Sequence, residues 1–494
     1  MTSTNGFPIC INSFFLRAAA CAALCAAVAA TMPASVHAAN LTAGPMAGHR
    51  DARSTILWLQ ADAKAAASIE YWPESGSATP GARKRSAPIF LQAADDFAAH
   101  ITLTHLQPGT RYRYRVLLGG KEAHLPHSLP HSLPHSQKMP ETLTFSTEAL
   151  WQWRKHSFMP AQGHTPPDFT VAFGSCAYAN EPPFDRSLVP AGKPYGSNYG
   201  IFASIAAKKP DVMLWLGDYL YLREADYGSP SGMARRWRFD RSQPQVQSLL
   251  RTGNHYAIWD DHDFGPNDSN ASFIYKDDSL RLFKRYWANG AWGLPETPGI
   301  FRSVSVNDVD FFLLDGRYYR DADSAQQLAG KTLFGAAQLR WLKNALLAST
   351  SRFKVIAVGN QALKEVPPRI EGWSHFADER REFLDWLLVN RINGVVFLSG
   401  DRHHTELNKQ ERHGTYPLYD FTCSPLTSGV HAPGRNEDMS RADAGTVVNQ
   451  HNFCTLDFSG SWGERRMTMK SFDAEGRELW KREVGASDLM HARE

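Results

Sequence analysis

Short apolar runs alternate with amphipathic segments along the chain from residue 169 onward. Uninterrupted apolar runs are typical of strands covered on both faces, and apolar residues at helical spacing are typical of helices packed on such a sheet. The alternation predicts an α/β domain over residues 165–460. The expected strands are residues 169–176, 211–218, 256–263, 309–317, 353–361 and 394–401, and the expected helices are residues 200–210, 279–288, 336–349 and 380–390.

Residues 40–150 follow a different pattern, in which β-rich runs are separated by Gly, Pro and Ser turns. The runs are residues 54–61, 67–75, 100–106, 111–118 and 142–147. Their spacing predicts a small antiparallel β-sandwich. The histidine and proline repeat at residues 124–136 is interpreted as a solvated loop. At the other end of the chain, residues 461–494 predict a closing hairpin and tail.

The N-terminus has the pattern of an export signal. Arg17 precedes the apolar stretch AAACAALCAAVAA, and Val36 and Ala38 are small residues at the positions that a signal peptidase reads. A single arginine does not support a twin-arginine signal. Residues 1–38 are therefore predicted to be a Sec-type signal peptide of a periplasmic or secreted protein, with no transmembrane segment after its removal. The alternative is an uncleaved anchor.

Three cysteines remain beyond the predicted signal peptide, which is an odd number for an oxidising compartment. Cys423 and Cys454 are a possible disulfide, with buried free thiols as the alternative, and Cys176 is the candidate for a different role. The net charge of the 494 residues is only +3, without a lysine or arginine block. We therefore expect no specific nucleic-acid binding.

Polar and ionisable residues collect where the predicted strands end. The five strand ends read Gly174-Ser175-Cys176, Gly217-Asp218-Tyr219-Leu220-Tyr221, Trp259-Asp260-Asp261-His262-Asp263, Gly359-Asn360-Gln361 and Gly400-Asp401-Arg402-His403-His404. Buried charges cost several kcal/mol unless they are paired or bound to a cation. The carboxyl ends of neighbouring parallel strands meet at one edge of a sheet. The sequence therefore predicts a metal site at this edge.

The strand-end blocks resemble those of the PhoD-like alkaline phosphatases, a branch of the calcineurin-like and purple-acid-phosphatase metallophosphoesterases. Three blocks carry the resemblance in this order: GDYLY at 217–221, WDDHD at 259–263 and LSGDRHH at 398–404. The resemblance implies a four-layer α/β/β/α sandwich for residues 165–460. It also implies a small fibronectin III-like domain before it, and the segment LQPGTRYRYRVLL is similar to a turn and strand of such domains.

The resemblance also implies a set of metal ligands. Asp218 would bridge two cations, and Tyr221 would bind as phenolate, which favours ferric iron. Cys176 would add a thiolate, at a position where other metallophosphoesterases have an Asp-x-His pair and the PhoD-like branch has a cysteine. Asp401 and His403 lie two residues apart and can point to the same side. Asp401 suits a hard ion, and His403 suits the iron.

The block at 259–263 is followed by further oxygen donors. The resemblance implies that Asp261 takes the place of an asparagine ligand of other metallophosphoesterases, and Asn267 is a further candidate ligand. Calcium takes six to eight oxygen ligands, which such a set of donors can supply. The resemblance implies iron with calcium, so the expected cofactors are Fe3+ and Ca2+, with Zn2+, Mn2+ or Mg2+ as alternatives at the second site. His262 falls where the family keeps a histidine that contacts substrate. Arg317 is a candidate phosphate clamp, with an ion pair to Asp315 or another acid as the alternative.

The predicted function is that of an exported metal-dependent phosphoesterase, which hydrolyses phosphate mono- and/or diesters with water made reactive by the cations. Three alternatives stay open. They are a cell-surface binding protein with an inactive phosphatase-like domain, a metallohydrolase acting on a non-phosphate ester or a phosphonate, and an iron-containing oxidase. Substrate specificity is expected from two loops, residues 181–197 and 227–244.

Overall fold

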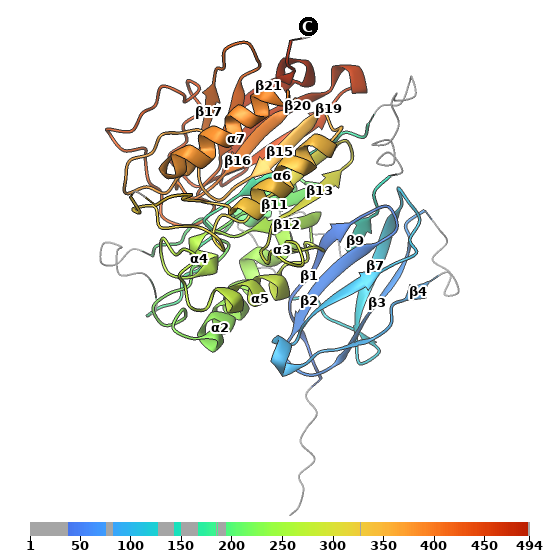
Figure 1. Cartoon of the computed structure of the whole chain (residues 1–494). Helices are drawn as coiled ribbons and strands as arrows, with labels where there is room; N and C mark the ends of the chain where they lie inside the picture. The colour runs from blue at the N-terminus through green and yellow to red at the C-terminus, as the bar shows by residue number, and fades with distance from the viewer. Residues whose placement is uncertain are drawn as a thin grey trace, which may run out of the picture. The chain divides into compact units, whose positions relative to one another are not determined.

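A nine-stranded sheet runs through the chain in the order β21-β20-β19-β10-β11-β12-β1-β2-β6 (Figure 1). In chain order its strands are β1 Leu41–Arg50, β2 Thr55–Ala61, β6 Ala98–Leu103, β10 Phe169–Gly174, β11 Val212–Leu216, β12 Asn254–Ile258, β19 Asn452–Ser459, β20 Arg466–Asp473 and β21 Glu478–Gly485. β10, β11 and β12 are parallel neighbours. Their carboxyl ends therefore lie at the same edge of the sheet.

The computed structural model describes residues 38–75, 83–126, 143–149, 166–183, 185, 194–326 and 328–492. The predicted signal peptide lies outside these residues except for Ala38, and most of the histidine and proline repeat lies outside them as well. Among the helices within these ranges, none is long and apolar enough to cross a lipid bilayer.

A six-stranded sheet packs against the first through an apolar core. Its order is β13-β14-β15-β16-β18-β17, and β14, β15, β16 and β18 are parallel. The Phe458 ring of β19 lies 6.4 Å from that of Phe311 and 5.4 Å from that of Phe353, across the interface between the two sheets. The strands are β13 Arg302–Val306, β14 Val309–Leu313, β15 Phe353–Ala357, β16 Val395–Ser399, β17 Glu406–Gln410 and β18 Leu418–Thr422.

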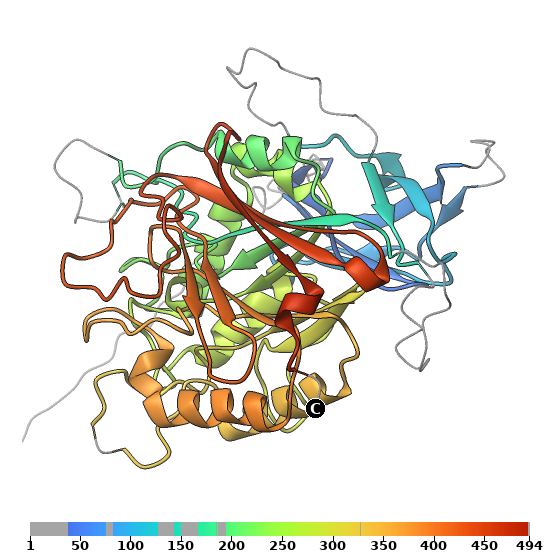
Figure 2. The ribbon, with the colours of Figure 1, turned by 90° about the horizontal axis from the view of Figure 1, so that it is seen from above.

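Helices lie on both outer sides of the strands, with α7 and α2 on opposite sides (Figure 2). The helices are α1 Ile201–Ala207, α2 Pro230–Arg241, α3 Gln247–Leu250, α4 Asp261–Phe264, α5 Lys276–Tyr286, α6 Ala336–Ala348 and α7 Ala377–Val389. The α/β class is therefore confirmed, while the four-layer count stays a prediction.

Two local predictions were wrong. The expected loop at 227–244 contains α2, which begins with Ser229 accepting a hydrogen bond from the Gly232 amide and with Pro230 in the first turn. The expected strand at 256–263 ends at Ile258, and a short helix follows it. The Asp260 amide donates to Asp263 Oδ2 at 3.1 Å, which closes this turn.

The expected β-runs of residues 40–150 are present as β2, β6 and three strands of a third sheet, β3 Ala66–Pro73, β7 Arg111–Leu118 and β9 Leu143–Ser146. The short strands β4 Lys84–Arg85, β5 Ile89–Phe90 and β8 Lys121–Glu122 extend that sheet. The sequence did not predict β1, which pairs in parallel with β12. The nine-stranded sheet thus runs across the predicted domain boundary. The fibronectin III-like character of this region stays a prediction.

The closing hairpin is present as the antiparallel pair β20 and β21. β19 pairs with β20 on one side and with β10 on the other, so the hairpin extends the sheet that carries the first strand-end block.

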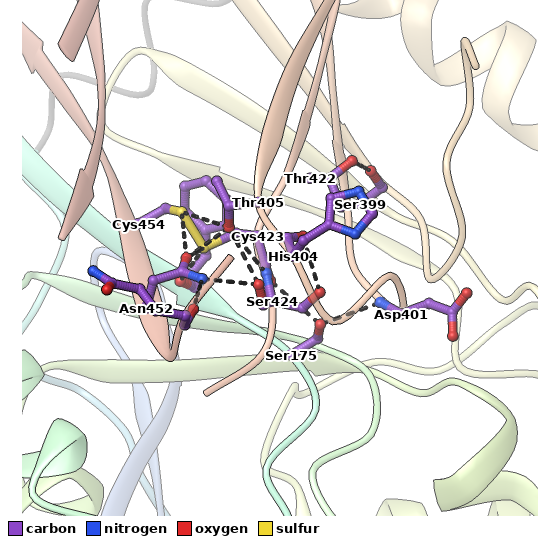
Figure 3. Close-up of a disulfide and its surroundings, with 12 residues drawn as sticks. Ser175, Ser399, Asp401, His404, Thr405, Thr422, Cys423, Ser424, Asn452 and Cys454 are labelled. Carbon is purple, nitrogen blue, oxygen red and sulfur yellow. Dashed lines mark hydrogen bonds between the residues drawn. A yellow bond between two sulfur atoms is a disulfide. The ribbon is translucent and has the colours of Figure 1, made fainter. Parts of the chain in front are cut away.

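Cys423 and Cys454 form the disulfide that the sequence suggested (Figure 3). It joins the end of β18 to β19 directly behind the strand end that carries Cys176. The Ser175 hydroxyl donates to the Cys423 carbonyl at 3.3 Å and accepts from the Asp401 amide at 3.3 Å. The disulfide therefore supports two of the strand ends that the sequence singled out.

We expect Cys423→Ser to lower the free energy of unfolding. Closing a loop with a sequence separation of 31 residues is worth about 3–4 kcal/mol in the chain-entropy estimate. Urea unfolding of the variant and of reduced wild-type protein should show the same loss. Two reactive thiols at Cys423 and Cys454 in non-reduced, unfolded wild-type protein would contradict the disulfide.

Candidate metal centre

Four of the predicted ligands adopt a backbone conformation that is rare for residues with a side chain. Cys176, Asp218, Asp401 and His403 have φ of 61°, 50°, 68° and 57°. The left-handed conformation costs roughly 1–2 kcal/mol for a residue with a Cβ, and such residues cluster at functional sites. All four lie two to four residues after the last residue of β10, β11 or β16, so the strain lies in the turns that follow these strands.

Two glycines let the strand ends approach one another. Gly217 has φ of 92°, and a Cβ added to it would lie 2.6 Å from Asp260 Cβ. A Cβ added to Gly400 would lie 2.6 Å from Ser175 Oγ. A larger residue at either position would push the strand ends apart.

One cluster combines sulfur, nitrogen and oxygen donors. Ligand atoms of Cys176, Asp218 and His403 lie within 4.8 Å of one another, and all three residues are buried. Cys176 Sγ is 3.6 Å from Asp218 Oδ2. The Tyr221 hydroxyl is 3.3 Å from His403 Nε2 and is also buried. The structure thus brings these four predicted ligands together.

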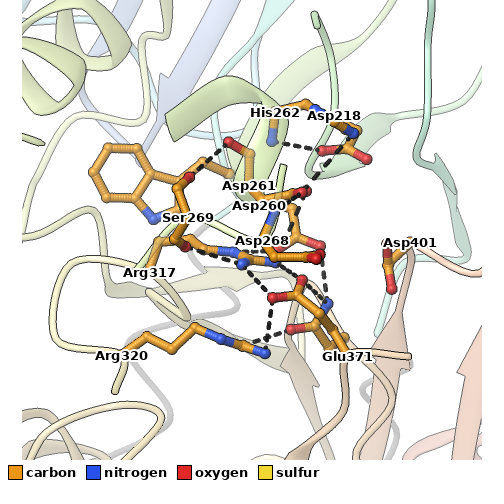
Figure 4. Close-up of polar contacts among 12 residues, drawn as sticks. Asp218, Asp260, Asp261, His262, Asp268, Ser269, Arg317, Arg320, Glu371 and Asp401 are labelled. Atoms are coloured by element: carbon orange, nitrogen blue, oxygen red, sulfur yellow. Dashed lines mark hydrogen bonds and ion pairs between the residues drawn. The ribbon is translucent and has the colours of Figure 1, made fainter. Parts of the chain in front are cut away.

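Two further clusters consist mainly of carboxylates (Figure 4). Asp218, Asp261 and His262 form one, and Asp260, Asp261, Glu371 and Asp401 form the other. Asp218 belongs to the sulfur-containing cluster as well as to a carboxylate cluster, which is the placement required of a bridging ligand. Asp261 connects the two carboxylate clusters.

His262 contacts residues of both the sulfur-containing cluster and the carboxylate clusters. Its amide donates to Asp218 Oδ1 at 3.3 Å, its ring is 4.2 Å from that of Tyr221, and its Nε2 is 3.8 Å from Asp261 Oδ2. Asn267 lies on the loop after α4 and is exposed. The structure therefore places His262 at the centre and Asn267 towards solvent.

Arg317 is fully buried among acidic groups. Its Nε donates to Asp260 Oδ1 at 2.6 Å, and its Nη1 donates to Glu371 Oε1 at 2.8 Å and to the Ser269 carbonyl at 3.2 Å. These contacts favour the alternative that the sequence left open, an ion pair with acids, over a phosphate clamp. The partners of the guanidinium are Asp260 and Glu371, whereas Arg317 donates to Asp315 through its backbone amide.

Two acidic residues that help to build the site were not among the predicted metal ligands. Asp263 accepts hydrogen bonds from the amides of Asp218 at 2.5 Å and Leu220 at 3.3 Å and so fixes the loop after β11. Glu371 reaches the site from the irregular segment between β15 and α7. Glu371 belongs to no motif and to no predicted strand end, so the sequence pattern does not indicate a role for it.

Burial raises the pKa of four aspartates of the centre, whereas Arg317 and Arg320 hold the pKa of Glu371 below its ordinary value despite its burial. Burial and then the neighbouring carboxylates raise the pKa of Asp218 well above its ordinary value. The pKa rises to about 7 for Asp401 and to about 8 for Asp263, in both cases mainly through burial. Burial also raises the pKa of the Cys176 thiol and the Tyr221 phenol. In the absence of a cation these groups hold protons, and a cation would displace them.

The donor chemistry fits two different cations. Thiol, phenol and imidazole donors together suit a transition ion, and a phenol with a raised pKa loses its proton only to a strongly acidic one. The carboxylate clusters suit a hard ion with oxygen ligands.

We expect metal-stripped protein to lose stability as the pH rises. The Asp401 and Asp263 carboxyls have pKa values raised to about 7 and about 8 when folded, so their stabilising contribution is full below about pH 4 and disappears as the pH passes 7–8. The free energies of unfolding of metal-loaded and metal-stripped protein, measured with denaturant, should therefore differ more at pH 8.5 than at pH 5, by at least about 2 kcal/mol. A difference that does not change with pH would contradict these shifts.

Residues 173–472 match the PhoD-like phosphatase family, and residues 38–137 match a domain family of unknown function, DUF7800. Alkaline phosphatase D of Bacillus subtilis (strain 168) is 26% identical over an alignment of 345 positions, and the match covers 58% of this chain and 55% of that protein. The chain thus matches about half the length of this curated relative.

Two solved structures share the fold. A structure of PhoD aligns with a TM-score of 0.67 and 16% identity, covering 90% of this chain and 92% of the other. The purple acid phosphatase PPD1 of yellow lupin aligns with a TM-score of 0.58 and 10% identity, covering 89% and 74%. Because the family match extends over more than half of the chain and includes every strand-end block, the chain belongs to the PhoD-like phosphatase family.

Proposed function

We propose that this chain is a metal-dependent phosphoesterase that hydrolyses phosphate mono- and/or diesters. The observation that carries the proposal is the position of Asp218, which is shared between a cluster with sulfur and nitrogen donors and a cluster of carboxylates. Neighbouring sites of different donor chemistry suit two different cations, and such pairs are widely used to clamp a phosphoryl group.

The proposed cofactors are Fe3+ and Ca2+. Cys176, Asp218, Tyr221 and His403 would hold the iron. Asp218, Asp261, Asn267 and Asp401 would hold the calcium, with Zn2+, Mn2+ or Mg2+ as alternatives there. When bound, the two cations would neutralise the phosphoryl oxygens and lower the pKa of a water molecule, which could then lose a proton and attack phosphorus.

The chain's own residues would orient the substrate and handle the leaving group. His262 is held beside Asp218 by its amide and beside Tyr221 by its ring, so its imidazole would protonate the departing oxygen. We assign Arg317 to positioning Asp260 and Glu371, because carboxylates already occupy its guanidinium. Ser175 donates to a carbonyl, and its neighbour Cys176, with Sγ at 3.3 Å, is already assigned to the iron, so a serine nucleophile is not proposed.

We further propose that the protein is exported to the periplasm or secreted. The disulfide between Cys423 and Cys454 supports an oxidising compartment. The N-terminal pattern of Arg17 and the apolar stretch after it supports a Sec-type signal. Radiolabelled or tagged full-length chain should yield a mature product that begins after Ala38 in the exported fraction.

The proposed reaction is tested with p-nitrophenyl phosphate, its bis ester and p-nitrophenyl acetate on protein exported with its metals. Hydrolysis of one or both phosphate esters, without comparable cleavage of the acetate, is expected. Cleavage of the acetate alone would favour a metallohydrolase acting on other esters. No hydrolysis of any of the three would favour a binding protein with an inactive phosphatase-like domain.

A further inference from the structure

The turn after β16 carries two predicted metal ligands with an arginine between them. Asp401 belongs to one of the carboxylate clusters, and His403 belongs to the sulfur-containing cluster. The guanidinium of Arg402 is held by other residues. Its Nη1 donates to Gln361 Oε1 at 2.7 Å, and its Nη2 donates to Glu437 Oε1 at 2.7 Å. The residue between the two ligands is therefore anchored by partners of its own.

These partners belong to a closed ring of buried polar side chains. Glu437 Oε2 lies 3.0 Å from Lys364 Nζ, and Lys364 Nζ lies 2.8 Å from Glu406 Oε1. Gln361 Nε2 donates to Glu406 Oε1, which closes the ring back to Arg402. The four charged side chains are at most 4% exposed. Two are cations and two are anions, so the charges balance within this set, which we call the charge ring.

The charge ring joins three parts of the chain that lie far apart in the sequence. Gln361 and Lys364 follow β15, and Arg402 and Glu406 lie at the turn from β16 to β17. Glu437 comes from the irregular connection between β18 and β19. Buried charged pairs are costly to break when one partner is removed. The charge ring therefore fixes the turn after β16 relative to two other segments.

The turn after β16 needs such support because its backbone is strained on both sides of Arg402. Asp401 and His403 have φ of 68° and 57°. Residues with a Cβ keep this left-handed conformation only where the surrounding structure over-determines it. Arg402 supplies a constraint of this kind, because its planar guanidinium points toward two fixed acceptors at once. Loss of one acceptor would let the turn relax away from the geometry that brings the two ligands to the centre.

We propose that Glu437 is a positioning residue that acts through Arg402 to hold Asp401 and His403 in the geometry that binds the cations. The proposal deepens the function proposed above and rests on it, because that function requires cations at these two ligands. Glu437 belongs to none of the ligand clusters found among the described residues, so it would act on the cations only through the turn. Groups that orient metal ligands in this way typically change metal affinity by about 10–100-fold when they are removed.

The test compares Glu437→Gln with Asp308→Asn and uses Co2+ as the probe. Co2+ is titrated into exported, metal-stripped protein against a competing chelator, and the visible absorption of the bound ion is followed. Asp308 is the matched control, because its carboxylate also pairs with a buried arginine, Arg465, at 2.9 Å. Asp308 precedes β14, at the opposite end of the parallel strands β14, β15 and β16 from Asp401. Glu437→Gln should bind Co2+ about 10–100-fold more weakly than wild-type protein. Asp308→Asn should lose stability and keep wild-type affinity.

A double variant, Arg402→Gln with Glu437→Gln, keeps the test decisive if the single variant does not fold. Replacing both partners of a buried ion pair costs far less stability than removing one of them. The double variant should therefore be more stable than Glu437→Gln. Its affinity for Co2+ should remain about 10–100-fold below that of wild-type protein, because the fork of the guanidinium is gone. Recovery of wild-type affinity together with stability would overturn the positioning role.

The outcomes separate this proposal from the proposed function. Wild-type affinity in Glu437→Gln would overturn the positioning role of Glu437 and leave the metal centre intact. The same conclusion would follow if Asp308→Asn lost as much affinity as Glu437→Gln, since the loss would then reflect stability alone. If wild-type protein bound no Co2+, both the proposed function and the positioning role would be overturned.

Discussion

Asp218→Asn is expected to lower kcat/KM for phosphate esters by about 10³-fold without unfolding the chain, since a cation clamp on the phosphoryl group is worth several kcal/mol. An amide offers one oxygen, so it cannot serve two cations as the shared carboxylate would. The fold should survive, because burial and four neighbouring carboxylates already raise the pKa of Asp218, and a neutral side chain suits this position in the absence of a cation. Steady-state kinetics and denaturant unfolding of the variant check both parts.

Asp457→Asn is the control for this change. Asp457 is a half-buried acid of β19 that pairs with Lys470 at 2.9 Å and lies away from the strand-end blocks. It should keep wild-type kcat/KM. Wild-type activity and wild-type metal content in the Asp218→Asn protein would show that Asp218 does not bridge two cations.

The strand ends that build the site could be predicted from the sequence because each one is a local signal. A buried apolar strand followed by Gly and a carboxylate, as at Gly217 and Asp218, predicts a functional turn without knowledge of the fold. Glu371 could not be predicted in this way, because it reaches the centre from an irregular segment. Its role depends on Arg317 and Arg320, which draw its carboxylate inward, and that contact is visible only in three dimensions.

The parts of the fold that were missed also depend on long-range contacts. β1 contains Gly44, Pro45 and Gly48, which normally argue against a strand. It forms because β12 and β2 pair with it on its two sides. A sequence pattern likewise gives no sign that the N-terminal β-rich region and the α/β domain share one sheet.

Arg317→Met is expected to lower the free energy of unfolding by about 3–5 kcal/mol, the usual cost of removing one partner from a buried ion pair. The change leaves Asp260 and Glu371 buried without the guanidinium that now contacts both. Urea unfolding of metal-stripped protein measures the effect without a contribution from the cations. The matched control is Arg302→Met, because Arg302 is also buried but no carboxylate contacts its guanidinium among the described residues.

The same variant separates the two roles that the sequence left open for Arg317. A positioning residue should lose stability and activity together, and Arg317→Lys should restore part of both because the charge is kept. A large loss of kcat/KM with unchanged stability would instead assign Arg317 to the phosphate itself.

The central claim is that separate strand ends hold a centre of two different cations and that this centre makes water reactive. The most direct test is the metal content of natively exported protein, measured together with phosphate-ester hydrolysis during removal and return of the metals. About one iron and one hard divalent ion per chain are expected, with activity lost on chelation and regained in proportion to the ions returned. Full hydrolysis by protein that contains no stoichiometric transition ion would contradict the account.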